Sequence, residues 1–112
     1  MFIAMNRFKI HPGYEAEFER VWLERESHLQ NVEGFVEFHL LQGPSSDDNT
    51  LYASHTVWAS REAFEAWTRS EAFRAAHRNA GANSHIYVEG PRFEGFDVVQ
   101  RMGPTSSGTE RM

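Results

Sequence analysis

Residues 56–77 read TVWASREAFEAWTRSEAFRAAH, and this stretch decides the fold. It opens on the end of an apolar, β-branched run that is typical of a strand. Ser60 then offers an N-cap for a helix that begins at Arg61. Ser70 offers a second N-cap, so we predict two short helices with a bend between them. The rest of the chain can be placed around this strand and its broken helix.

Outside this stretch, alternation and helical spacing predict the other elements. Alternating apolar residues predict strands, and a stripe at i, i+4, i+7, i+8 predicts an amphipathic helix. Polar turn residues at 43–49 predict a connection within a hairpin. The predicted elements are strands at Phe2–Ile10, Phe35–Gln42, Leu51–Trp58 and Phe93–Val99, a first helix at Tyr14–Gln30, and a loop over 79–90 in which Ile86–Val88 can pair briefly.

The predicted order β-α-β-β-α-β is that of a ferredoxin-like α+β sandwich. Phe2, Ala4 and Phe8 share one face of the first strand, and Ile3 and Met5 share the other. The helices would cover one face of the sheet, and the opposite face also carries apolar residues, so it needs a cover too. A second copy of the chain would supply it, and we therefore expect a homodimer that forms a dimeric α+β barrel.

Composition narrows the class of protein. The chain has 112 residues, 40% of them hydrophobic and 13% aromatic, with a net charge of −5 and no cysteine. It is too apolar for a disordered protein, and it has no basic stripe for nucleic acid or an anionic membrane. Disulfides and cysteine-based metal sites are excluded. Without a signal-peptide pattern or a run of about 20 apolar residues, we expect a cytoplasmic location.

The domain organisation is simple. We expect one domain over residues 1–102, since no internal linker or repeat appears. The tail 103–112 is rich in Gly, Ser, Thr and Pro, and we expect it to be disordered.

Three residues stand out from their surroundings. Asn6 lies in mid-strand on an apolar face, where it either bonds a neighbouring backbone or points an amide at a ligand. His77 shares a helical face with Phe73; it is either structural or solvated, or it is a ligand for iron. Trp67, paired with Phe64, either packs in the core or presses on a flat ligand. On one unbroken helix Trp67 and His77 would point about 80° apart, but the bend at Ser70 can re-aim the second segment.

The sequence contains no motif of other common catalytic or metal-binding sites. No nucleophile elbow, phosphate loop or dinucleotide fingerprint appears, so no flavin or NAD is expected. His39 and His55 lie on neighbouring strands, but no third ligand is evident, and no zinc site is expected. The residues alone therefore lead to an α+β dimer with a possible apolar pocket.

The skeleton T-V-W-x-S-x-x-A-F-x-x-W-x-x-S-x-x-F-x-A-A-H over residues 56–77 closely resembles the second-helix region of the IsdG-type haem-degrading monooxygenases. Asn6-Arg7 and Glu33-Gly34-Phe35 fit the same family. The resemblance covers roughly residues 2–100. The segments 1–8 and 34–41 look most like the HmuQ-like branch of the antibiotic-biosynthesis-monooxygenase superfamily.

This resemblance implies haem as substrate and cofactor together, one per subunit, with O₂ and an external electron donor or reductase. His77 matches the axial ligand of the haem iron, Trp67 the residue that ruffles the porphyrin, and Asn6 the amide that contacts the oxygen. The implied products are iron and an open-chain tetrapyrrole, and the resemblance to the HmuQ-like branch favours biliverdin.

Further residues are expected around the haem. We predict that Phe64, Phe73 and Arg25 join the haem-binding set. The propionates are anionic, so an arginine is expected to receive them. The candidates on the two helices, each of which can equally belong to a solvated face, are Arg20, Arg25, Arg74 and Arg78.

Two other functions remain open. A cofactor-free quinol or polyketide oxygenase of the same fold would not need a histidine at position 77. A non-enzymatic haem carrier would bind haem through His77 and leave it intact. A dimeric barrel with a vestigial pocket is a third, purely structural possibility.

Overall fold

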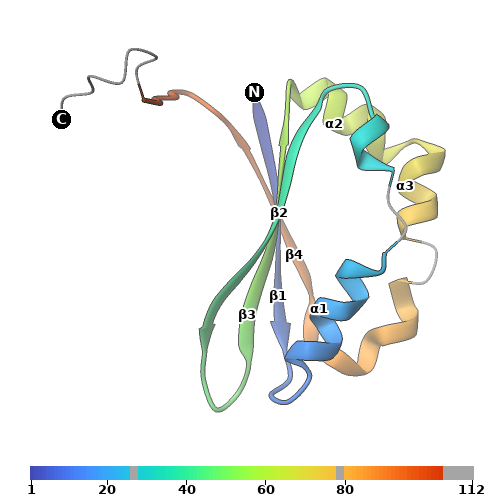
Figure 1. Ribbon diagram of the computed structural model, residues 1–112, viewed down its shortest axis with the longest axis vertical. Coiled ribbons are helices and arrows are strands. Elements are labelled where there is room, and N and C mark those ends of the chain that lie inside the picture. The colour runs from blue at the N-terminus through green and yellow to red at the C-terminus, as the bar shows by residue number, and fades with distance from the viewer. Residues whose placement is uncertain (26–27, 78–79, 105–112) are drawn as a thin grey trace.

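The computed structural model describes residues 1–25, 28–77 and 80–104. The chain forms a four-stranded antiparallel sheet with helices packed on one face (Figure 1). Its elements in chain order are β1 (Phe2–Ile10), α1 (Glu15–Leu23), the 3₁₀ helix η1 (Leu29–Asn31), β2 (Phe35–Ser45), β3 (Thr50–Trp58), α2 (Arg61–Thr68), α3 (Glu71–Ala76), the 3₁₀ helix η2 (Ala80–Ile86) and β4 (Tyr87–Asp97). The predicted ferredoxin-like order is therefore confirmed.

The sheet has the strand order β2-β3-β1-β4, with the first strand in the interior. Along β1 the even-numbered residues face the helices, and Phe2, Ala4, Phe8 and Ile10 are buried there. Asn6 breaks this run at its middle. Its neighbours in register are Ser54 on β3 and Phe93 on β4.

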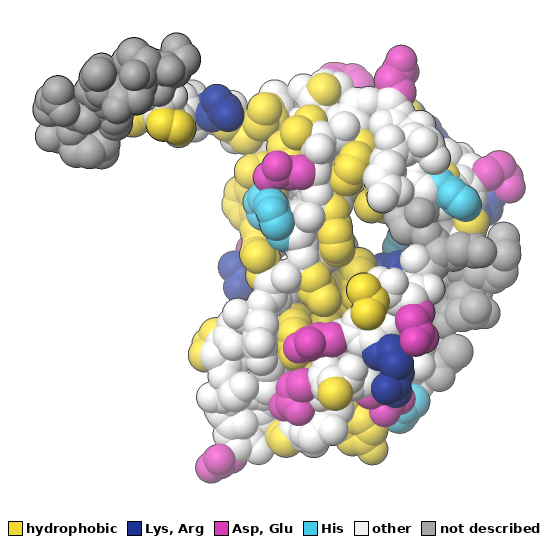
Figure 2. Space-filling model, viewed as in Figure 1, with side chains coloured by type: hydrophobic (Ala, Val, Ile, Leu, Met, Phe, Trp, Pro, Cys, Tyr) yellow, Lys and Arg dark blue, Asp and Glu magenta, His cyan; other side chains and the backbone are white. Residues whose placement is uncertain are grey.

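The core consists of two separate clusters, one on either side of Asn6. Phe8, Ile10, Phe18, Tyr52 and Ile86 form one cluster beneath α1. The other cluster, under α2, consists of Phe2, Ala4 and Trp58, with partly buried side chains such as Phe64 and Trp67 packed against it. Since neither cluster covers the middle of the sheet, a hollow remains there, which Figure 2 shows between the two helical parts.

None of the helices among the described residues covers the second face of the sheet (Figure 1). Its residues include Leu41, with an exposed fraction of 41%, and Phe96, with 46%. Ile3 and Met5, which face the same way, are only partly buried. An apolar sheet face of this kind is available for another protein surface.

Some predicted boundaries are wrong. The helix expected over Tyr14–Gln30 ends at Leu23, and Leu29 belongs to the separate η1. The segment expected as a loop over 79–90 contains η2 and the start of β4. β4 spans Tyr87–Asp97 rather than Phe93–Val99, because its pairing with β1 supplies hydrogen bonds to a stretch whose Gly90-Pro91 looks like a strand breaker.

The two predicted helix starts are confirmed. Ser60 and Ser70 cap α2 and α3, and each accepts a hydrogen bond from the backbone three residues on. Within the described ranges, no helix has the length and apolar character needed to span a membrane. The tail prediction falls mostly on residues 105–112, which lie outside the described residues.

Candidate functional site

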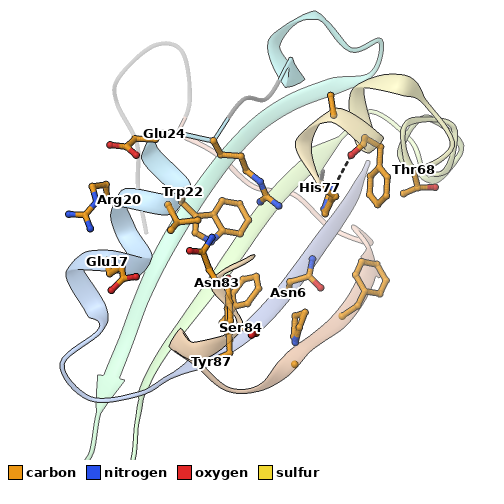
Figure 3. Close-up of a pocket in the computed structure, with 18 of the residues that line it drawn as sticks. Asn6, Glu17, Arg20, Trp22, Glu24, Thr68, His77, Asn83, Ser84 and Tyr87 are labelled. Carbon is orange, nitrogen blue, oxygen red and sulfur yellow. Dashed lines mark hydrogen bonds between the residues drawn. The ribbon is translucent and has the colours of Figure 1, made fainter. Parts of the chain in front are cut away.

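A cavity of about 1210 Å³ lies over the middle of the sheet, between α1 on one side and α2 and α3 on the other (Figure 3). Its lining combines aromatic rings with a few polar and charged groups, which is the usual make-up of a small-molecule site. The lining includes side chains from the sheet (Asn6, Phe93), from α1 and the residues after it (Arg20, Trp22, Arg25), from α2, α3 and the residue after it (Phe64, Trp67, Phe73, His77) and from η2 and β4 (Asn83, Ser84, Tyr87).

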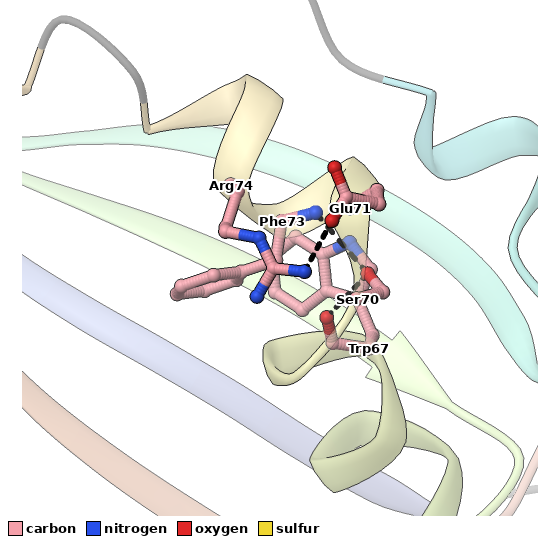
Figure 4. A network of polar contacts seen from close by, with 5 residues as sticks. All are labelled: Trp67, Ser70, Glu71, Phe73 and Arg74. Atoms are coloured by element: carbon pink, nitrogen blue, oxygen red, sulfur yellow. Dashed lines mark hydrogen bonds and ion pairs between the residues drawn. The ribbon is translucent and has the colours of Figure 1, made fainter.

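Ser70 lies at the bend between α2 and α3 (Figure 4), the two helices whose Trp67 and Phe73 line this cavity. The Ser70 hydroxyl donates to the Trp67 carbonyl at 2.6 Å and accepts from the Phe73 N–H at 3.2 Å. Ser70 thus bonds to the last turn of α2 and caps the start of α3, and serine side chains commonly make both kinds of local bond to the backbone. The break turns α3 so that Phe73 packs edge-on against Trp67, with ring centroids 4.9 Å apart.

His77 follows directly after α3 and is held in one orientation. Its ring stacks on Phe73, with centroids 4.1 Å apart. Its Nδ1 lies 2.8 Å from the Phe73 carbonyl oxygen. Because a carbonyl only accepts, this bond requires the proton on Nδ1 and leaves a lone pair on Nε2. Figure 3 shows the ring pointing into the cavity.

The surroundings of His77 favour its neutral form. Burial lowers the pKa of the imidazole below its ordinary value of 6.5. The bond to the Phe73 carbonyl opposes this shift, and the positive charge of Arg25 adds to it. A neutral imidazole with a free Nε2 lone pair is the form that binds a metal.

Asn6 points into the same cavity from the sheet (Figure 3). Within residues 1–25, 28–77 and 80–104, its side chain makes no hydrogen bond, and it is only partly buried. A half-buried amide between two apolar clusters would normally be paired. The Asn6 amide is therefore available to a ligand in the cavity.

Arg25 brings a positive charge to the other side of the cavity. Its guanidinium carbon lies 4.2 Å from the centroid of the Trp22 ring. Burial lowers the pKa of this guanidinium, which stays charged because its ordinary pKa is so high. A half-buried arginine in an otherwise acidic chain marks a place for an anionic group.

The other predicted arginines differ in position. Arg20 lines the cavity from α1. Arg74 pairs with Glu71 on the same helix (Figure 4) and is absent from the described cavity lining. Arg78 lies outside the described residues. Of the three candidates within the described residues, Arg20 and Arg25 thus line the cavity.

The structure also adds lining residues that the sequence patterns did not single out. Tyr87, Asn83 and Ser84 fall in the segment expected to be a loop. Burial raises the pKa of the Tyr87 phenol, so its hydroxyl keeps its proton. Recognising a strand that starts at Tyr87 would have placed this ring opposite Ile10 and beside the cavity.

The donor set limits the chemistry of the site. No group of three or more His, Asp or Glu side chains in the described residues could hold a bare metal ion. One histidine, in contrast, suffices for a metal that brings its other ligands with it, as iron in a porphyrin does. The aromatic walls formed by Trp67, Phe64 and Phe93 suit a flat ring system, and Arg25 suits its acidic substituents.

Comparison with known proteins places the chain among oxygenases. The family model described as antibiotic biosynthesis monooxygenase matches residues 1–79. A haem oxygenase (mycobilin-producing) of Mycobacterium tuberculosis is 30% identical over 103 residues, which are 92% of this chain and 93% of that protein.

The fold of this chain is also similar to solved structures of oxygenases. The haem-degrader MhuD of Mycobacterium tuberculosis, with two haems bound in its active site, superposes with a TM-score of 0.72 and 30% identity, over 92% of this chain and all of that one. SnoaB of Streptomyces nogalater, a cofactor-independent oxygenase, superposes with a TM-score of 0.66 and 26% identity, over 90% of this chain and 95% of that one.

Proposed function

Because the chain belongs to the antibiotic biosynthesis monooxygenase family, we propose that it is a haem-degrading monooxygenase. It binds haem as both substrate and cofactor and opens the porphyrin ring, using O₂ and electrons from an external donor. The observation that carries this proposal is the orientation of His77. Its Nδ1 is committed to the Phe73 carbonyl, and its ring faces an aromatic cavity with the Nε2 lone pair free.

The residues around the cavity fit a haem in named roles. His77 would hold the iron, while Trp67, Phe64 and Phe73 would contact the porphyrin. Trp67 is fixed by Trp58 behind it, with ring centroids 5.3 Å apart, so it can press on a bound ring without giving way. Arg25 would receive a propionate, because its charge lies inside the cavity. The family resemblance implies the same roles for His77 and Trp67.

Asn6 has the chemistry for the reacting side of the ring. Its unpaired amide N–H can donate a hydrogen bond to dioxygen and orient it toward the ring edge. When bound, haem supplies the iron that activates dioxygen and the carbon that is attacked. The protein would contribute the position of the ring and the neutral imidazole of His77.

The uncovered sheet face supports a homodimer. Phe96, Leu41 and Val36 are apolar and between 41% and 48% exposed there. We propose that a second copy covers this face, which would complete a two-sheet barrel.

The proposed monooxygenase domain spans residues 1–102. We propose that it acts in the cytoplasm, because a chain without cysteines does not need an oxidising compartment to form disulfides.

A cofactor-free oxygenase is the second candidate, because SnoaB superposes on most of this chain. Such an enzyme would leave the free Nε2 of His77 without a role. The two candidates are separated by whether the protein binds haem. A haem carrier differs from both, since it would bind haem and leave it unchanged.

The test is an absorbance series. Purified protein is mixed with hemin, and ascorbate is then added in air with catalase present. We expect a Soret band that forms and then decays as iron becomes chelatable, and His77→Ala should prevent the band from forming. A stable band, also with a physiological reductase as donor, would identify a carrier. The absence of any Soret band would refute haem binding and favour the cofactor-free oxygenase.

The product needs its own measurement. The Mycobacterium tuberculosis relative is described as mycobilin-producing, and we propose an open-chain tetrapyrrole of biliverdin type for this chain. Mass spectrometry of the extracted pigment would decide between a biliverdin and another bilin.

A further inference from the structure

Trp22 lines the cavity and has no role in the proposed function. It lies near the end of α1, and its indole is held by other rings on several sides. The Phe38 ring stacks on it, tilted by 13° with centroids 5.8 Å apart. Phe8 meets it edge-on, with centroids 5.7 Å apart and an angle of 64°. Rings packed in this way leave the indole little freedom, so it offers a rigid aromatic face to the cavity.

The Arg25 guanidinium lies over this face, 4.2 Å from the ring centroid. This distance is within the range of a cation–π contact, which a guanidinium favours because it is planar and weakly hydrated. Arg25 follows the last residue of α1, Leu23, by two positions and its backbone N–H lies 3.4 Å from the Trp22 carbonyl. The stack therefore extends beyond the regular helix.

The stacked guanidinium faces the ligand side of the cavity. Arg25, His77 and Tyr87 all line this one cavity, so the guanidinium shares the space that a ligand would fill. An arginine side chain free to swing into solvent would spend little time there.

We propose that Trp22 is a positioning residue that holds Arg25 in place to receive a haem propionate. This inference rests on the proposed function. Trp22 acts through Arg25 rather than through the porphyrin, because its rigid face is occupied by the guanidinium. It makes the cation available before the ligand arrives, so less conformational entropy is lost on binding.

The experiment is a double-mutant cycle on haem affinity, measured by Soret titration of the full chain. Trp22→Leu should weaken haem binding by about 3- to 30-fold, the range of a partly to fully desolvated cation–π contact. In an Arg25→Gln background, the same change should cost less than about 2-fold. Trp22→Phe, which keeps an aromatic face, should restore most of the affinity.

Two controls separate positioning from a loss of cavity shape. Haem dimethyl ester lacks the carboxylates, so Trp22→Leu should leave its affinity within about 2-fold of wild type. In an Arg20→Gln background, where the arginine lines the cavity from another position, the Trp22→Leu loss should persist in full. Thermal unfolding of each variant shows whether it is folded.

The outcomes are distinguishable. A wild type without a Soret band would overturn the proposed function and this inference together. A wild type that binds haem, with a Trp22→Leu loss that is undiminished in Arg25→Gln or equal for the dimethyl ester, would overturn the inference alone.

Discussion

The rings of Trp67 and His77 lie 6.2 Å apart between centroids and are tilted by 58°, although they belong to different helical segments. On a single continuous helix, side chains ten positions apart would point about 80° from each other. The break at Ser70 removes this difference and brings both rings to one cavity. The geometry of the proposed haem site thus depends on a helix cap.

The first prediction concerns this cap. Ser70→Ala removes the hydroxyl that accepts from the Phe73 N–H, and it should lower the free energy of unfolding by about 1 kcal/mol. It should also weaken haem binding, because His77 directly follows α3. Ser60→Ala is the matched control, since it removes the equivalent cap of α2, where the Ala63 N–H loses its acceptor. Denaturant unfolding and Soret titration measure both effects. Equal haem affinity in the two variants would contradict a role for the Ser70 break.

The second prediction concerns pH. Burial and the charge of Arg25 lower the pKa of His77 below 6.5, so the imidazole stays neutral to a lower pH than a free histidine. Haem affinity should therefore hold through pH 6.5 and fall only as the pH drops through this lowered pKa. In the haem-free protein, His77 takes up its proton less readily than in the unfolded chain, so its contribution to stability also declines below about pH 6.5.

The titration of His77 can be followed by NMR of the haem-free protein. Arg25→Gln should raise the pKa of His77, because it removes one of the two causes of the lowering. Arg20→Gln is the control that should leave this pKa nearer the wild-type value. A wild-type pKa of 6.5 or above would refute the predicted environment of His77.

The third prediction separates binding from reaction at Asn6. Asn6→Ala should leave the hemin affinity within about 3-fold of wild type, since the iron ligand is His77. The rate of haem decay with ascorbate should fall by about 10-fold or more, because one oriented donor is lost. Asn6→Asp keeps the shape but not the N–H donors, so it should be slow as well. A fast Asn6→Asp variant would show that shape, not hydrogen bonding, matters at this position.

The fourth prediction tests how tightly α2 packs against the start of β2. Gly34 has a φ of +86°, and a Cβ at this position would overlap the Cβ of Ala63 on α2. Gly34→Ala should therefore destabilise the fold by more than the roughly 1 kcal/mol expected from left-handed strain alone. Gly13→Ala is the matched control, because Gly13 has a φ of +92° but no described atom near its Cβ position. Equal losses in denaturant unfolding would mean that α2 shifts easily.

Several features followed from the sequence alone. Strict alternation over Phe2–Ile10 determined the first strand and which of its faces is buried, since a strand repeats every two residues. The serines at 60 and 70 determined both helix starts, because a cap is a local interaction. The three residues that looked out of place, Asn6, Trp67 and His77, all line the same cavity.

Tertiary structure decided the remainder. β4 begins at Tyr87 because β1 pairs with it, although Gly90 and Pro91 disfavour a strand locally. The stacking of Arg25 on Trp22 and the orientation of the His77 ring depend on contacts with Phe38, Phe8 and Phe73 that no spacing rule contains. Local patterns specify faces and caps, whereas the partners across a cavity are set by how separate elements pack. For this reason the sequence determined which side chains stand out, and only the folded chain decided what each one faces.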